Sequence, residues 1–449
     1  MTTPEQYIEN NRSRFLDELF TLLRQPSIST RNEGVQECAE LLSGMMKQVG
    51  IETRIMETAR HPVVYGEILK EGAPTVLVYG HYDVQPPEPF EAWHSPPFEP
   101  TIRDGRIYCR GSSDNKSQLF SYVKAVEAFR ETVGEVPVSI KFLYEGEEEI
   151  GSPNLAPFIK EHGNLLKADL AFFSDSHIHE SGRPLLILGL KGMVYVDLKV
   201  QCAADDTHSM RATAIPNPAW RLVWALSTLK DKDSRILIPG FYDDVRELTD
   251  LEKQAVAEIP CDEEELRRYF GVKEFLPGRS SKAFYFNLVS EPTCNIAGFN
   301  AGFTGEGSKT VLPARAAAKM DIRLVPDQKP EDILDKLRRH LNARGFNDIE
   351  VISHHFLEPS RTPIDHPAVA IIKDSLRDVY GLEPIVFPNI GGSGPNYVFT
   401  KILGVPCFVV PHAGHDQANH APNESMILEG YYRGIQTAVK TFEKLAAQP

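Results

Sequence analysis

Short apolar runs alternate with amphipathic stretches along the first part of the chain. The runs at 75–80, 138–144 and 168–174 are apolar almost throughout, which predicts buried strands. The stretch at 117–133 places its apolar residues with the period of a helix. Apolar strands that are separated by helices are typical of an α/β sheet covered on both faces. We therefore predict an α/β domain in this part of the chain.

The pattern changes character near residue 190. Alternating strand patterns and new helical patterns follow one another at 190–200, 218–229, 309–325, 329–344 and 347–356. The order strand, helix, strand, strand, helix, strand suggests a smaller α+β domain. After Pro359 the α/β pattern returns, with a helix predicted at 367–380 and a strand at 405–410. We predict one domain from residues 1–189 and 358–449, with a second domain, residues 190–357, inserted into it.

Composition and charge exclude several classes of protein. The proportions, 42% hydrophobic and 24% charged, are those of a soluble globular protein. A net charge of −14 argues against nucleic acid or an anionic membrane as partner. The N-terminus shows no signal sequence, and no run reaches the ~18 apolar residues that a membrane span requires. The six cysteines include no CxxC pair, so we expect free thiols and a cytoplasmic protein.

Four of the predicted strands lead into His, Asp or Glu residues. In chain order, these residues are His81 and Asp83, the acidic run 145–149, Asp175, and His420 at the end of a loop. In an open α/β sheet the site lies beyond the carboxyl ends of the strands, so these side chains can meet there. Asp114 lies in a Gly-Ser-Ser-Asp-Asn-Lys turn before a predicted helix and can reach the same crevice. Imidazole and carboxylate together suit zinc, with manganese or cobalt as substitutes.

Hydrolysis by two metal ions would use this mixture of side chains. Two ions ~3.5–4 Å apart need ligands for each and a carboxylate that bridges both, and they lower the pKa of a shared water. A further carboxylate must accept the proton of that water. The adjacent pair Glu148 and Glu149 can supply one base and one ligand. His81 and Asp83 point to the same side of an extended backbone, so Asp83 can orient the imidazole.

Simpler readings stay open for each position taken singly. A lone His or Asp at a strand end is usually a cap or a solvated residue, and the run 145–149 alone would be a solvated acidic turn. The GGSG segment at 391–394 can cradle a phosphate, but it lacks the P-loop lysine and any GxGxxG context.

Eight motifs, in family order along nearly the whole chain, resemble the M20 metallopeptidase family. They are GHYDVQP (80–86), the segment 93–116, EGEEEIGS (145–152), SDSH (174–177), DTHS (206–209), the segment 309–326, GGSGP (391–395) and HAPNE (420–424). The segment ILIPGFYDDV (236–245) is similar to the carnosinase-like dipeptidase branch. The resemblance implies a zinc-peptidase-type α/β sandwich with an inserted α+β lid and dimerisation domain.

The resemblance also implies a role for each matched residue of the first domain. His81 and Asp175 would hold one divalent ion, Glu149 and His420 the other, and Asp114 would bridge both. Asp83 would orient His81, and Glu148 would be the general base and later the acid. The peptide bond Asp114–Asn115 is expected to be cis, at a usual cost of ~3 kcal/mol.

The inserted domain resembles the family's lid, which implies a homodimer. His208 would reach the active site of a partner subunit and stabilise the oxyanion, and Arg323 with Ser393 would bind the substrate's terminal carboxylate. Without the resemblance, His208 is a loop histidine and Arg323 a surface ion pair. Three residues depart from the family, which usually has glycine at Cys109, Ser117 and Met210.

The leading hypothesis is a two-metal hydrolase of dipeptides or small peptides with a free C-terminal carboxylate, acting through a metal-bound water. The alternative within enzymes is an amidohydrolase that deacylates N-acyl amino acids with the same metal ions. A non-catalytic binding protein would lack a ligand or the base, but every matched position is filled. A nucleotide-binding enzyme would be supported by the GGSG segment and the α/β pattern alone.

Overall fold

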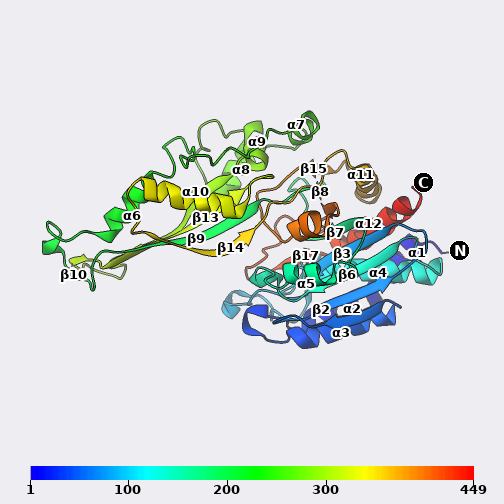
Figure 1. Cartoon of the computed structure of the whole chain (residues 1–449). Helices are drawn as coiled ribbons and strands as arrows, with labels where there is room; N and C mark the ends of the chain where they lie inside the picture. Colours follow the sequence, from blue (N-terminus) through cyan, green and yellow to red (C-terminus); the bar gives the residue numbers. More distant parts are fainter. Residues whose placement is uncertain (1, 449) are drawn as a thin grey trace. The chain divides into compact units, whose positions relative to one another are not determined.

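The computed structural model describes residues 2–448, which form two compact units (Figure 1). Unit 1 comprises the residues up to Gly189, Arg361–Pro388 and the residues from Val398 on, and unit 2 comprises Leu190–Ser360 and Asn389–Tyr397. The predicted α/β class with an inserted α+β part is confirmed. The segment Asn389–Tyr397, which the predicted limits place in the first domain, belongs to unit 2 because Gly392 and Ser393 hydrogen-bond to Lys191 and Arg323.

An eight-stranded sheet forms the centre of unit 1. Its order is β1 (Glu52–Met56), β2 (Val63–Ile68), β6 (Ser139–Glu145), β3 (Thr75–His81), β7 (Leu170–Phe173), β16 (Cys407–Val409), β8 (Leu185–Ile187) and β15 (Ile385–Phe387). The predicted strands at 75–80, 138–144, 168–174 and 405–410 are confirmed as β3, β6, β7 and β16. These four strands are parallel, so their carboxyl ends lie along one edge of the sheet.

Helices pack around this sheet, as the alternation of apolar and amphipathic stretches predicts. The helices are α1 (Pro4–Asn10), α2 (Arg12–Arg24), α3 (Val35–Gln48), α4 (Lys116–Thr132), α5 (Leu155–His162), α11 (Pro367–Tyr380) and α12 (Leu428–Ala446). Helix α4 contacts β3, α12 and α1, while α3 contacts β1 and β2. Helix α4 is buried over nearly its whole length, which fixes the position of the turn that precedes it.

A small three-stranded sheet brings two distant loops of unit 1 together. Its order is β17 (Ser425–Ile427), β5 (Arg106–Tyr108) and β4 (Thr101–Arg103), and Ser425 pairs with Tyr108 in the antiparallel register. The chain that leaves β5 leads to Asp114, and the chain that enters β17 comes from His420. Both loops are therefore joined to the same end of one ladder.

Unit 2 is a twisted four-stranded antiparallel sheet with helices on one face. Its order is β11 (Thr293–Ala301), β13 (Arg315–Leu324), β9 (Gly192–Gln201) and β14 (Glu350–Leu357). Helices α6 (Pro218–Ser227) and α10 (Pro330–Ala343) cover its apolar face, where alternate residues such as Val196 and Met320 are buried. Strand β11 escaped prediction because it is an edge strand with an exposed face and a register shift at Ile296–Gly298.

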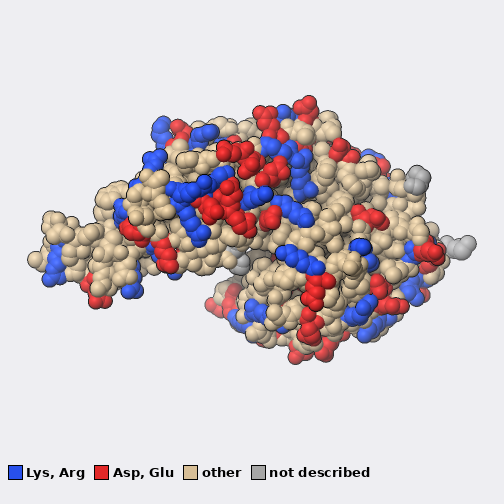
Figure 2. Space-filling model, in the orientation of Figure 1, with Lys and Arg blue, Asp and Glu red and all other residues tan. Residues whose placement is uncertain are grey.

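Three further helices and a short ladder complete unit 2. They are α7 (Asp250–Ala257), α8 (Glu263–Phe270) and α9 (Lys282–Ser290), and the ladder pairs β10 (Thr207–His208) with β12 (Val311–Leu312). Among the described residues, no helix has the length and apolar character to cross a bilayer, and no cysteine pair forms a disulfide. Acidic and basic side chains are intermixed on the face drawn in Figure 2.

Candidate metal centre

His81 is the last residue of β3, and both of its ring nitrogens face oxygen atoms. Its Nε2 lies 3.1 Å from Asp114 Oδ1 and 3.6 Å from Asp175 Oδ2. Its Nδ1 lies 3.1 Å from the backbone carbonyl of Asp83 and 3.4 Å from Oδ1 of the same residue. Asp83 therefore lies against Nδ1, and Nε2 is directed to the two other carboxylates.

The carboxylate of Asp114 lies between two histidines. Its Oδ1 faces His81, and its Oδ2 lies 3.1 Å from His420 Nε2. The same His420 nitrogen lies 3.2 Å from Glu149 Oε2. The peptide bond Asp114–Asn115 is cis, as predicted. The side chains of four residues thus converge from β3 and three loops: His81, Asp114, Glu149 and His420. The Asp114 carboxylate faces both histidines.

These donor atoms fit a divalent cation. Atoms of His81, Asp114 and Glu149 that can act as ligands all lie within 4.8 Å of one another. Nε2 of His81 is buried and finds no hydrogen-bond partner among the described residues, although two carboxylates face it. Imidazole nitrogen with carboxylate oxygen is the donor set of zinc, and manganese or cobalt accept it as well.

Asp83 also holds the acidic pair in place, a task that its sequence position did not reveal. Its Oδ1 accepts a hydrogen bond from the backbone N–H of Glu148 at 3.2 Å, and its Oδ2 accepts from Glu149 at 3.1 Å. Gln85 donates to Glu149 Oε2 at 2.8 Å. The side chains of Glu148 and Glu149 are therefore presented from a backbone turn that is anchored to the His81 loop.

The electrostatics of the group favour positive charge. Burial and the neighbouring carboxylates raise the pKa of Glu148 well above its usual range, and burial with the charge of Asp114 raises the pKa of Glu149 to about 7. Hydrogen bonds to Asp114 and Glu149 raise the pKa of His420 to about 10. Burial disfavours protonation of His81, but Asp114, Asp175 and Asp83 outweigh it and raise its pKa. Carboxylates dominate the group, and a bound cation would lower the electrostatic repulsion between them.

The three other predicted site residues lie in unit 2, and the structure brings two of them together. Arg323 on β13 donates from Nη1 to Ser393 Oγ at 2.8 Å, and it also pairs with Asp321 at 2.8 Å. His208 is exposed on β10, where its Nε2 lies 3.3 Å from Thr310 Oγ1. Met210, beside it in sequence, is 74% exposed. Arg323 and Ser393 thus form one polar group, and His208 lies on a separate ladder.

Lys191 is a buried cation next to this polar group, and its type alone did not single it out. Its Nζ donates to the carbonyl of Glu291 at 2.6 Å, and its N–H donates to the carbonyl of Gly392 at 2.9 Å. Burial lowers the pKa of its ammonium group to about 8, and the positive charge of Arg323 acts in the same direction. The sequence signal for it is a lysine inside the otherwise apolar run LILGL-K-GMV.

Replacing Lys191 with methionine should remove a pH dependence of stability. A lysine whose pKa falls from 10.5 to about 8 on folding destabilises the native state below pH 8, and this cost disappears as pH rises to 10.5. The free energy of unfolding of the parent protein relative to Lys191→Met should therefore rise by roughly 3 kcal/mol over that interval. Urea unfolding at pH 7.5 and 10.5 measures the difference, with exposed Lys199→Met as control. A constant difference would contradict the buried charge.

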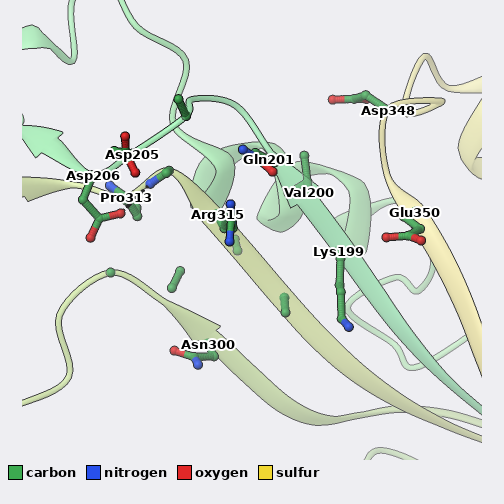
Figure 3. A pocket seen from close by; sticks show the side chains of 16 residues that line it. Lys199, Val200, Gln201, Asp205, Asp206, Asn300, Pro313, Arg315, Asp348 and Glu350 are labelled. Atoms are coloured by element: carbon green, nitrogen blue, oxygen red, sulfur yellow. Dashed lines mark hydrogen bonds between the residues drawn. The ribbon is translucent and has the colours of Figure 1, made fainter.

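A separate cavity of about 1020 Å³ lies in unit 2 (Figure 3). It is lined by side chains of both charges, among them Lys199, Arg315, Asp205, Asp206 and Glu350. None of the predicted site residues contributes to its lining. The predicted site residues therefore lie outside this cavity.

Comparisons with known proteins agree with the resemblance that the motifs indicate. The model of the family described as peptidase family M20/M25/M40 matches residues 77–444. The Beta-Ala-His dipeptidase of Homo sapiens is 31% identical over 86% of this chain and 78% of its own length. The Cys-Gly metallodipeptidase of Candida albicans is also 31% identical, over 96% of this chain and 94% of its own.

Solved structures superimpose on this chain over nearly its whole length. An M20 family metallo-carboxypeptidase from Sulfolobus solfataricus superimposes with a TM-score of 0.92 at 39% identity, covering 97% of this chain and 99% of that one. A dipeptidase from Saccharomyces cerevisiae superimposes with a TM-score of 0.85 at 27% identity, over 99% and 98% of the two chains. The family resemblance found in the motifs is thereby confirmed.

Proposed function

The chain belongs to peptidase family M20/M25/M40 and is a hydrolase, and on this premise we propose that it cleaves dipeptides or small peptides with two divalent metal ions. The observation that carries the proposal is the carboxylate of Asp114, whose two oxygens each face one histidine at 3.1 Å. A carboxylate that faces two sets of donors is what a pair of ions requires. Zinc is the ion that the donor set favours.

The distances support the ligand roles that the family resemblance implies. His81 and Asp175 would hold one ion, His420 and Glu149 the other, and Asp114 would bridge both. Two ions held there would lower the pKa of a water molecule and polarise the carbonyl under attack. Asp83 contacts Nδ1 of His81 and so keeps Nε2, on the opposite side of the ring, directed toward Asp114 and Asp175.

Glu148 is the general base of the proposed reaction. It follows Glu147 in the turn at the end of β6, and its backbone N–H is held by Asp83, so its carboxyl group is presented next to the ligand Glu149. Burial and neighbouring carboxylates raise its pKa, which suits a group that first accepts a proton from water and then protonates the leaving amine.

The substrate's C-terminal carboxylate is proposed to bind at Arg323 and Ser393. The guanidinium presents several donors in a plane, which suits a carboxylate, and Ser393 already contacts Nη1. Asp321 holds the guanidinium from the other side. The names of the relatives, dipeptidase and metallo-carboxypeptidase, agree with a substrate that ends in a free carboxylate.

We also propose a homodimer that forms through unit 2 and a cytoplasmic location. His208 would act in the active site of a partner subunit, where its imidazole would stabilise the oxyanion. Its exposure on the β10 ladder supports this role, because the ring is accessible to a second chain. The absence of disulfides among the six cysteines agrees with a reducing compartment.

A panel of dipeptides tests the proposed function. Protein reloaded with zinc or manganese should release free amino acids from several dipeptides, and the same protein kept in chelator should release none. N-acetyl amino acids are assayed in parallel. Release from N-acetyl amino acids alone would replace the dipeptidase proposal with deacylation of N-acyl amino acids, and no release from either class would overturn both.

A further inference from the structure

Glu424 is fully buried, four residues after the ligand His420, and its carboxylate is surrounded by donors from the Asp114 loop. Its Oε1 accepts from the N–H and Oγ of Ser113 and from the N–H of Asp114, at 2.9, 2.9 and 3.0 Å. Its Oε2 accepts from Nη1 of Arg110 at 2.8 Å and from the N–H of Gly111 at 3.0 Å. All five partners lie in the segment 110–114, so one side chain binds the whole turn.

Arg110 extends this contact to a third loop. Its side chain is 1% exposed, and its guanidinium pairs with Glu424 and donates from Nη2 to the carbonyl of Pro86 at 3.2 Å. Pro86 lies five residues after His81 in the same loop. The buried pair thus connects the segments that carry His81, Asp114 and His420, which lie far apart in the sequence.

The backbone hydrogen bonds between the two loops end close to the Arg110–Glu424 pair. The N–H of Cys109 donates to the carbonyl of Glu424 at 3.1 Å, which continues the β5–β17 ladder by one step. Beyond that bond the two chains separate toward Asp114 and His420. His420 has a φ of 59°, a left-handed conformation that is uncommon for a residue with a side chain. The ladder brings the loops together, and the Glu424 side chain holds them past its end.

We infer that Glu424, together with Arg110, is a positioning residue that sets the Asp114 carboxylate against His420 and so determines the affinity of the site for metal ions. The inference rests on the proposed ligand roles. The carboxylate form is required because every group that faces it is a donor. A glutamine would direct its NH₂ group at one of these donors, so it would lose acceptor bonds at either oxygen position.

Metal affinity measured on Glu424→Gln tests the inference. Zinc(II) binding is followed by competition with a chromophoric chelator, and cobalt(II) binding by its visible absorption spectrum. We expect zinc to bind about 10–100-fold more weakly than to the parent protein, and the cobalt spectrum to change, because outer-sphere partners orient metal ligands. Glu429, whose side chain is half-buried and pairs with Arg12, supplies the matched control Glu429→Gln, which should leave the affinity unchanged.

A second variant separates positioning from stability. Arg110→Met/Glu424→Leu removes both charges of the pair at once, so no lone buried charge remains. The N–H groups of Gly111, Ser113 and Asp114 lose their acceptor, so we expect a lower unfolding temperature than that of the parent protein, and zinc binding is measured at a temperature where circular dichroism shows the variant folded. The folded variant should still bind zinc about 10–100-fold more weakly, since the five hydrogen bonds to the turn are gone.

Parent-like zinc affinity and cobalt spectrum in Glu424→Gln would overturn the inference. So would parent-like affinity in the folded double variant. Neither outcome depends on peptide cleavage, so failure of the proposed reaction in the dipeptide assay is distinguishable from failure of this inference.

Discussion

Replacing Glu148 with alanine should lower kcat by about 10²–10⁴-fold while the protein keeps its metal ions. The loss is expected because Glu148 is a carboxyl group of the cluster that is neither a proposed ligand nor, like Asp83, a group that orients His81, and its backbone is held beside Glu149 by Asp83. The measurement combines kcat on the best dipeptide with metal content from atomic emission on the same preparation. Glu148→Gln keeps the size of the side chain and should lose turnover equally, since an amide does not accept the proton.

Glu161→Ala is the matched control for this prediction. Glu161 is an acid of helix α5 whose side chain is 78% exposed, so its removal should leave both kcat and metal content unchanged. Turnover that survives in Glu148→Ala with full metal content would move the base role elsewhere. Loss of both metal and turnover would instead make Glu148 a ligand.

The strands that carry the site were predictable because they are buried on both faces. A run such as TVLVYG followed by His81 can be interpreted from sequence, since a parallel strand inside a sheet needs apolar residues at nearly every position. The same property makes the polar residue at its carboxyl end conspicuous. The exposed edge strand β11 carries no such signal, because its environment does not demand apolar residues at regular positions.

What holds the proposed ligands in place was not predictable from local pattern. Glu424 contacts a turn about 310 residues earlier in the chain, and nothing near it in the sequence indicates that partner. Arg323 and Ser393 lie 70 residues apart, and only the family resemblance placed them in one group. The segment Asn389–Tyr397 belongs to unit 2 for a similar reason, since its partners Lys191 and Arg323 lie far from it in the sequence. Such contacts form only when the whole chain has folded, and the periodicity of neighbouring residues carries no information about them.

Removing the metal ions should lower the unfolding temperature and abolish turnover together. Ions that bind only the folded state stabilise it by about 4 kcal/mol each when present at a thousand times their Kd, which corresponds to a shift on the order of 10 °C. Chelation leaves Asp114, Glu149 and the neighbouring carboxylates close together in a buried site without the charge of the metal ions. Thermal unfolding in chelator and after reloading with zinc measures the shift. In Asp114→Ala the shift should largely vanish, whereas exposed Asp335→Ala should keep it.

The size of that shift should depend on pH in a defined direction. Without metal, burial and the charge of Asp114 raise the pKa of Glu149 to about 7, above its usual value of 4.5. A raised pKa means that the metal-free folded protein gains stability from this group as pH falls below 7 and loses it as pH rises through 7. Zinc instead requires the ionised carboxylate, so its binding weakens as pH falls. The difference in unfolding temperature between zinc-loaded and metal-free protein should therefore be larger at pH 8 than at pH 6. An equal difference at both values would mean that Glu149 does not contribute its carboxylate to the metal site.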